Sequence, residues 1–349
     1  MARAPSLLAT AALAACFLLP AGAAAAPYAP PRGRVLSGGT GGYDAAHIQD
    51  FARRSGRQPA VYQFFFTPHW RGDDQRALNW QRGLLQLAAE QHVRPMFTLS
   101  TARGGHGGST ITPAGLARGG GDAYLIQLGD LAAQSGQVLY VRLMAEMNNW
   151  NNPYCAFGAT GAFRGRSHST RAFRAAWRRA ALILRGGPVA SIDARLARLG
   201  LPPLLTNRAE LPRPRIALLW VPFTAGLPNV RGNGPGAYWP GARYVDWVGT
   251  DFFANSPTFR LLGRFYRDRR WRRKPFVFGE WALWGRDNPA FVRRFFRWVR
   301  RHRRVQMVVY NQGSNLKRFL RLQSFPRSAG ELRRQLRAPV FGFYPPELR

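Results

Sequence analysis

Short apolar runs alternate with longer amphipathic segments along most of the chain. The runs are rich in Val, Phe, Tyr and Trp, a composition typical of buried strands. Between them, apolar residues recur every three or four positions, which predicts helices that pack on one face. The eight runs are RVLSGG (34–39), PAVYQFFF (59–66), RPMFTLS (94–100), VLYVRLMA (138–145), RIALLWVPF (215–223), YVDWVGTDFF (244–253), KPFVFGEW (274–281) and VQMVVYNQ (305–312).

Strands that alternate with helices form a parallel sheet, and eight such units predict a closed barrel. Only the fifth connection, 224–242, is irregular and rich in Gly and Pro. We therefore expect an α/β fold, a (β/α)8 TIM barrel with a single catalytic domain over 34–323. A Pro-rich lead-in (27–33) precedes the barrel, and a C-terminal tail (324–349) follows it.

The first 26 residues have the pattern of an export signal. A short basic start precedes an apolar run, and the alanines up to Ala26 offer a small-residue cleavage site. This predicts a secreted protein without a membrane span in the mature chain. We also expect a monomer. In the alternative, LAAC (13–16) is a lipoprotein box and Cys16 carries a lipid anchor, although FLLP then continues the apolar run beyond Cys16.

The 349 residues include 51 Lys and Arg against 17 Asp and Glu, a formal net charge of +34. Nearly all the positive residues are arginine, a bias that often reflects the base composition of a genome. The charge nevertheless favours contact with anionic polymers, such as acidic glycans of the cell envelope. Nucleic acid is not expected as the main partner, because no known nucleic-acid-binding module is visible.

Three acidic residues stand where predicted strands end, which is where barrel enzymes carry their chemistry. Glu146 ends the fourth run, Asp251 the sixth and Glu280 the seventh. Glycoside cleavage needs two carboxyls, one protonated to donate to the leaving oxygen and one ionised. Glu146 and Glu280 fit this pair. The chemistry needs no metal and no cofactor.

Aromatic and amide side chains near the same strand ends suit a sugar site. Flat rings stack on the C–H faces of sugars, and amides bond to hydroxyl groups. For any single ring, packing inside the protein is an equally good interpretation. The candidates for substrate binding are His69, Trp70, Asn148, Trp150, Trp220, Asp251, Trp281, Trp284 and Tyr310.

Three segments resemble glycoside hydrolase family 26, the mannanase-like family of a retaining clan of barrel glycosidases. They are VRLMAEMNNW (141–150), YWPGARYVDWVGTDFF (238–253) and KPFVFGEWALWG (274–285), and the resemblance covers most of 34–312. It implies that Glu146 is the acid/base and Glu280 the nucleophile, with Trp150, Trp281 and Trp284 as subsite walls. It also implies hydrolysis of β-linked glycans, most often β-1,4-mannan, with retention and without a metal.

The chain departs from this family at two positions. Ala145 replaces the His that usually precedes the acid/base and helps to hold the sugar near its 2-hydroxyl, which puts mannan specificity in question. Phe253 replaces a Tyr whose hydroxyl would help to keep the nucleophile ionised. Tyr310, at the end of the eighth run, is the candidate to compensate.

Competing interpretations remain open. Glu146 could be a structural acid paired with Arg142 or another arginine, and a close arginine would lower its pKa and spoil the acid role. The protein as a whole is a retaining endo-β-glycosidase, a non-catalytic glycan- or envelope-binding barrel, or a polyanion-binding protein.

Overall fold

The computed structural model describes residues 27–70, 74–103, 108–313 and 318–349. The predicted export signal (1–26), including Cys16 of the lipoprotein alternative, lies outside these residues. No helix in the described part of the chain is long and apolar enough to cross a membrane.

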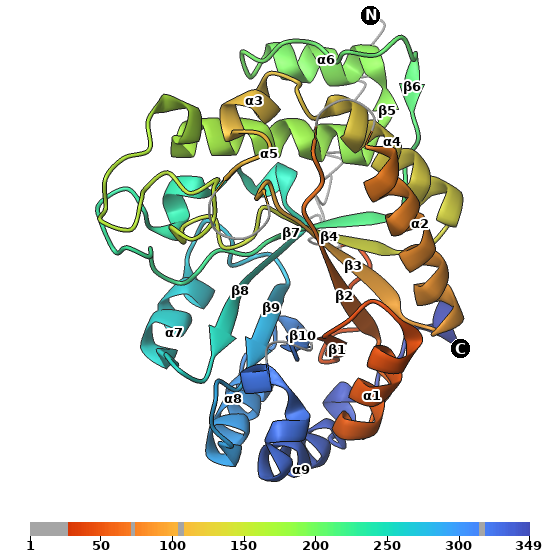
Figure 1. The fold of residues 1–349 in the computed structure, drawn as a ribbon, viewed down its shortest axis with the longest axis vertical. Helices are drawn as coiled ribbons and strands as arrows, with labels where there is room; N and C mark the ends of the chain where they lie inside the picture. The colour runs from red at the N-terminus through yellow and green to blue at the C-terminus, as the bar shows by residue number, and fades with distance from the viewer. Residues whose placement is uncertain (1–26, 71–73, 104–107, 314–317) are drawn as a thin grey trace, which may run out of the picture.

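Eight parallel strands close into a barrel, which confirms the predicted fold (Figure 1). Each strand lies within one of the eight apolar runs or overlaps it. Around the barrel they are β1 (Leu36–Thr40), β2 (Val61–Phe66), β3 (Arg94–Leu99), β4 (Leu139–Leu143), β7 (Ile216–Trp220), β8 (Trp247–Phe253), β9 (Phe276–Ala282) and β10 (Val305–Asn311). We call the end of the barrel at the carboxyl termini of these strands the mouth.

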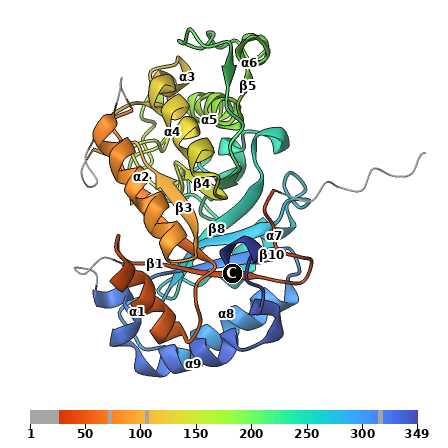
Figure 2. The ribbon, with the colours of Figure 1, turned by 90° about the vertical axis from the view of Figure 1, so that its right-hand side faces the viewer.

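Helices form a ring outside the strands, as the two views show (Figures 1 and 2). The helices of the ring are α1 (Ala45–Ser55), α2 (Gln75–Glu90), α4 (Asp122–Ser135), α5 (Thr170–Arg185), α7 (Phe259–Arg267), α8 (Pro289–Arg301) and α9 (Pro326–Leu336). Between β7 and β8 the chain makes only two 3-10 turns, at Pro235–Tyr238 and Ala242–Tyr244, as the Gly- and Pro-rich composition predicted.

The sequence analysis did not anticipate the small elements at one side of the ring. A short helix, α3 (Pro113–Ala117), precedes α4. After α5, the strands β5 (Gly187–Pro188) and β6 (Glu210–Leu211) pair as a two-stranded antiparallel sheet, and the helix α6 (Val189–Ala197) lies between them in the chain. Strands of two residues give no usable periodicity, so their pattern was invisible in the sequence.

The last helix of the ring comes from the segment assigned above to a C-terminal tail. Helix α9 packs against α8 and α1 and so closes the outer layer beside β10 and β1. Beyond it, the carboxylate of Glu347 accepts a hydrogen bond from Arg94 Nε (2.8 Å), at the end of the barrel opposite the mouth. The segment 324–349 is therefore part of the packed barrel structure.

Side chains of the strands divide between two apolar clusters. The inner cluster fills the barrel and includes Ala145 and Val221. The outer cluster lies between strands and helices and includes Trp220, Trp281 and Tyr310. Successive residues of a strand point to opposite faces, so neighbours in sequence fall into different clusters. This division decides which strand-end residues can reach the mouth.

Candidate active site

The segment after β4 places Glu146 at the mouth with a strained backbone. Met144 and Glu146 have φ values of 42° and 51°, in the left-handed region that costs a non-glycine residue about 1–3 kcal/mol. Surrounding groups hold this conformation. Glu146 N donates to Val221 O (2.7 Å), and the Tyr154 hydroxyl donates to Ala145 O (2.7 Å). Residues in such strained conformations are characteristic of functional sites.

Arg142 joins two of the three strand-end carboxylates inside the barrel. Its Nη1 donates to Glu280 Oε1 (2.5 Å), and its Nη2 donates to Asp251 Oδ2. The side chain of Arg142 is 2% exposed. Gly279 leaves room for it, because a Cβ at Gly279 would lie 2.8 Å from Arg142 Nε and 3.0 Å from Asp251 Oδ1.

Glu280 on β9 has a donor on each carboxylate oxygen. Arg142 holds Oε1, and Asn311 Nδ2 at the end of β10 donates to Oε2 (2.5 Å). The amide of Asn311 is itself oriented, because its Oδ1 accepts from Gly313 N (2.6 Å). A carboxylate that accepts hydrogen bonds from a guanidinium and an amide is stabilised in its ionised form.

Glu146 has surroundings that favour its protonated form. Burial raises its pKa above the usual range, and the negative charge of Glu280 raises it further. The hydrogen bond with Asp251 and then the charge of Arg142 oppose this effect, but Arg142 makes its ion pairs with Asp251 and Glu280. The structure therefore does not support the alternative of a Glu146–Arg142 pair. Asn149 Nδ2 donates to Glu146 Oε2 (3.0 Å) and orients the carboxyl group.

Asp251 is the third carboxyl of the cluster. Burial raises its pKa well above the usual range, and the hydrogen bond that it shares with Glu146 requires one of the two to be protonated. Its Oδ1 is buried and accepts no hydrogen bond from a donor in the described residues. Three carboxyls face one arginine here, and the pKa values of Glu146 and Asp251 are both raised, which favours a proton shared between these two groups.

Two of the predicted tryptophans have exposed rings near the mouth. Trp150, in the loop after Glu146, is 36% exposed, and Trp284, after β9, is 40% exposed. The ring of Trp284 packs against Phe253 (centroids 5.5 Å apart) and Phe319 (4.9 Å). Both tryptophans have free surface for a ligand.

The other predicted rings lie in the outer cluster and have no such surface. Trp220 packs against Trp271 and Trp239, and Trp281 stacks on Phe295 of α8 (4.6 Å). The Tyr310 hydroxyl donates to Leu320 O (2.8 Å), so it cannot compensate for Phe253 at Glu280. Trp70 is buried as well, with its Nε1 donating to Ser100 O (2.9 Å). We interpret these four rings (Trp70, Trp220, Trp281 and Tyr310) as packing residues.

The remaining candidates divide in the same way. Asn148 is fully buried, and its side chain bonds only to the backbone of the β7–β8 connection, at Phe223 and Ala225. It shapes the mouth and has no free donor for a sugar. His69 is exposed, and its backbone N donates to Asp74 Oδ2 (2.7 Å).

Sequence reasoning did not choose as site residues the two amides that contact the carboxyl pair. Asn148 was chosen from a group of asparagines that included Asn149, and Tyr310 was chosen instead of Asn311. Asn149 follows Asn148 in the loop, and Asn311 follows Tyr310 at the end of its strand. In the described part of the chain, no group of three His, Cys, Asp or Glu side chains is arranged to hold a metal ion.

Solved structures with the same architecture include several mannanases. A double mutant of the Cellulomonas fimi endo-β-1,4-mannanase has a TM-score of 0.60 at 15% identity, over 91% of this chain and 74% of that chain. The GH26C protein of a Muricauda species has a TM-score of 0.59 at 12% identity, over 90% and 89%. The catalytic domain of the GH26 endo-β-1,4-mannanase of Bacillus sp. JAMB-750 has a TM-score of 0.55 at 11% identity, over 89% and 88%.

At these identities the likeness shows the fold: the chain has the barrel architecture found in glycoside hydrolase family 26, in agreement with the resemblance in its sequence. A scan against protein-family models found no match, and a search of curated proteins found none either.

Proposed function

We propose that the protein is a secreted, retaining endo-β-glycosidase that hydrolyses a β-linked polysaccharide, with β-mannan as the first candidate. The observation that carries the proposal is that the two carboxyls at the mouth, Glu280 and Glu146, have different environments. Glu280 is held by Arg142 and Asn311, whereas the pKa of Glu146 is raised by burial and by Glu280. Retaining glycosidases need this combination of an ionised nucleophile and a protonated acid.

In the proposed reaction, Glu280 attacks the anomeric carbon while Glu146 gives its proton to the leaving glycosidic oxygen. The sugar is then bonded covalently to Glu280, and Glu146 is ionised. Glu146 next takes a proton from water, whose oxygen attacks the same carbon and releases Glu280. Two displacements at one carbon retain its configuration. Asp251 shares a hydrogen bond with Glu146 and can donate to the Glu146 carboxylate while it is ionised between the two steps.

The nature of the sugar is the less supported part of the proposal. The methyl side chain of Ala145 belongs to the inner cluster and offers no donor to a 2-hydroxyl. Trp150 and Trp284 are exposed and suit the stacking of sugar rings, which any β-linked glycan presents. We therefore place β-mannan first, on the likeness to mannanases, and other β-glycans next.

A glycan-binding barrel without activity is the second candidate, because Phe253 lacks the hydroxyl that the family places near the nucleophile. One experiment separates the two candidates. The protein, Glu280→Ala and Glu146→Ala are incubated with β-mannan, β-1,3- and β-1,4-glucan, xylan and acidic glycans. Cutting by the wild type alone, with the β-anomer as the first product seen by NMR, supports the enzyme. Binding to a glycan with no cutting by any variant would refute it.

A further inference from the structure

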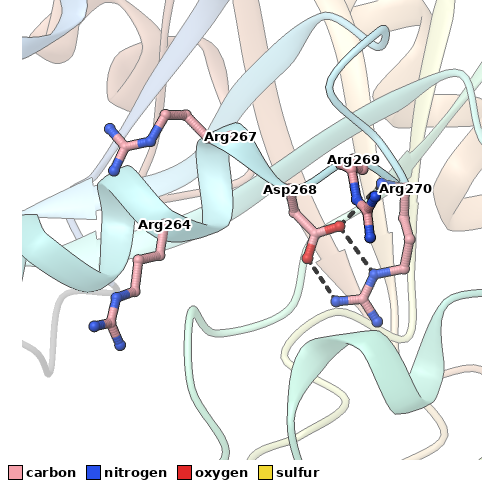
Figure 3. A pocket seen from close by; sticks show the side chains of 5 residues that line it. All are labelled: Arg264, Arg267, Asp268, Arg269 and Arg270. Atoms are coloured by element: carbon pink, nitrogen blue, oxygen red, sulfur yellow. Dashed lines mark hydrogen bonds and ion pairs between the residues drawn. The ribbon is translucent and has the colours of Figure 1, made fainter.

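An arginine-lined hollow lies at the end of the barrel opposite the mouth. It has a volume of about 520 Å³ and is lined by Arg264, Arg267, Asp268, Arg269 and Arg270 (Figure 3). These residues end α7 and lead into β9, whose amino end is remote from Glu280. A ligand in this hollow would leave the carboxyl pair open. We call the four arginines the arginine cluster.

Charge is concentrated here even for so basic a chain. Between 260 and 274 stand seven arginines and Lys274 against a single acid, Asp268. Asp268 neutralises only one member of the cluster, because its carboxylate pairs with a single side chain: Arg270 Nε donates to Oδ1 (2.9 Å) and Nη2 to Oδ2 (2.5 Å). Arg264, Arg267 and Arg269 are exposed, and Asp268 makes no ion pair with them.

The cluster stands on a rigid base. The guanidinium of Arg270 lies over the ring of buried Trp271, 4.6 Å from its centroid. Arg304, shortly after α8, donates to Lys274 O (2.7 Å) and to Tyr266 O, and so ties α8 to α7. Exposed arginines of α8 extend the positive surface at this edge. Arg267 at the end of α7 and Arg301 at the end of α8 are both near enough to His302 for their charges to lower its pKa.

The geometry points to a polymer as the ligand. In Figure 3 the side chains of Arg264 and Arg267 point away from Asp268, whereas Arg270 turns toward it. One small anion cannot contact guanidinium groups that diverge in this way. A chain with regularly spaced negative charges can contact each of them in turn.

The surroundings favour an acidic polysaccharide over nucleic acid. Proteins that hold single-stranded nucleic acid offer exposed aromatic rings on which bases stack. Here the ring of Trp271 is covered by Arg270, and that of Tyr266 by Arg304 at 3.9 Å. Large exposed aromatic side chains in the described residues come from other segments: Tyr43, Trp80, Trp150, Phe163, Trp284 and Phe319.

We propose that the arginine cluster binds a carboxylate-bearing polysaccharide and holds the protein on it while the mouth stays free. The test uses polygalacturonate as the probe and calorimetry at low and moderate salt. The variant replaces Arg264, Arg267, Arg269 and Arg270 with Gln. A matched control replaces four exposed arginines on or beside other helices, Arg76, Arg82, Arg195 and Arg198, and loses the same charge.

We expect the cluster variant to bind about tenfold or more weakly, and the control to change by less than about threefold, because four exposed ion pairs each contribute modestly. Wild-type binding should weaken steeply with salt. Equal losses in both variants would overturn the proposal, since binding would then follow net charge alone. So would tighter binding of single-stranded DNA than of polygalacturonate, or no binding at all. Equal thermal unfolding of the three proteins excludes a folding defect, and the test does not depend on glycosidase activity.

Discussion

Replacing Arg142 with Leu should destabilise the protein in a way that depends on pH. Arg142 is the counter-charge of Asp251 and Glu280, whose side chains are 0% and 9% exposed. Removing one partner of a buried ion pair costs about 3–5 kcal/mol, because it leaves an uncompensated charge. That is a large part of a typical total stability of roughly 5–15 kcal/mol.

The pH dependence follows from the sign of the charges. Near pH 7, the buried carboxylates that pair with Arg142 need the guanidinium, so the full cost applies. Burial raises the pKa of Asp251 and Arg142 opposes this, so without Arg142 the carboxyl of Asp251 takes up a proton more readily, and the cost shrinks toward pH 4. Urea unfolding at the two pH values measures this difference. Adding Asp251→Asn to the Arg142→Leu variant should recover part of the stability at pH 7.

The chain contains a matched control in a second buried ion pair. Arg179 Nε donates to Asp122 Oδ1 (2.7 Å), and the two side chains are 1% and 2% exposed, within the helical layer. Arg179→Leu should lose similar stability, but the folded fraction should keep its activity and pH profile. If Arg142→Leu unfolds at the wild-type urea concentration, or loses equal stability at both pH values, the reasoning about this cluster is wrong.

Three further predictions concern the site. Asn311→Leu should lower kcat/KM roughly tenfold to a hundredfold, because a hydrogen bond to a charged group is worth about 1.5–3 kcal/mol. An unchanged kcat/KM would show that Asn311 does not act on Glu280. Glu146→Gln should be at least as stable as the wild type, and its advantage in the free energy of unfolding should grow with pH. The raised pKa of Glu146 favours the folded state of the wild type at low pH, and this contribution is lost as pH rises through the folded pKa. A variant whose stability relative to the wild type is lower at pH 8 than at pH 5 would contradict this. Trp284→Ala should raise KM severalfold and leave urea unfolding unchanged. Trp281→Ala should cost about 3–5 kcal/mol of stability, measured by urea unfolding. The opposite pattern would refute our assignment of Trp284 to ligand binding and Trp281 to packing.

The barrel itself was predictable from the sequence because its signal is repeated eight times. Apart from β1 (LSGGT), the strands are short runs rich in apolar residues, many of them β-branched or aromatic, and most of the helices between them carry an apolar stripe. The positions of Glu146 and Glu280 followed from the rule that barrel chemistry sits where strands end. What the pattern could not supply was the strained turn at Met144 and Glu146, because its geometry depends on contacts from Val221 and Tyr154, which are distant in sequence.

The sequence left open how the last segment packs, for a different reason. The segment 324–349 starts with a helix that has few large apolar residues, so its stripe was weak. Topology carried the better signal. Each of the first seven strands needs its outer face covered, and the eighth, β10, needs the same cover. A covering segment after residue 324 was therefore to be expected, and here it is the helix α9, whereas the connection between β7 and β8 makes only 3-10 turns.

The strand ends carried one further signal, the alternation of side chains between the two faces. Once Glu280 is taken to face the inside of the barrel, Trp281 must face the helices. At the end of β10, Tyr310 and Asn311 stand in the same relation, and only one of them can reach Glu280. The choice of Tyr310 rested on the kind of residue, whereas alternation makes the two exclusive. Tyr310 Oη is bonded to Leu320 O, and Asn311 Nδ2 to Glu280. The hydrogen bond that Phe253 cannot donate to Glu280 is therefore supplied by an amide from the neighbouring strand.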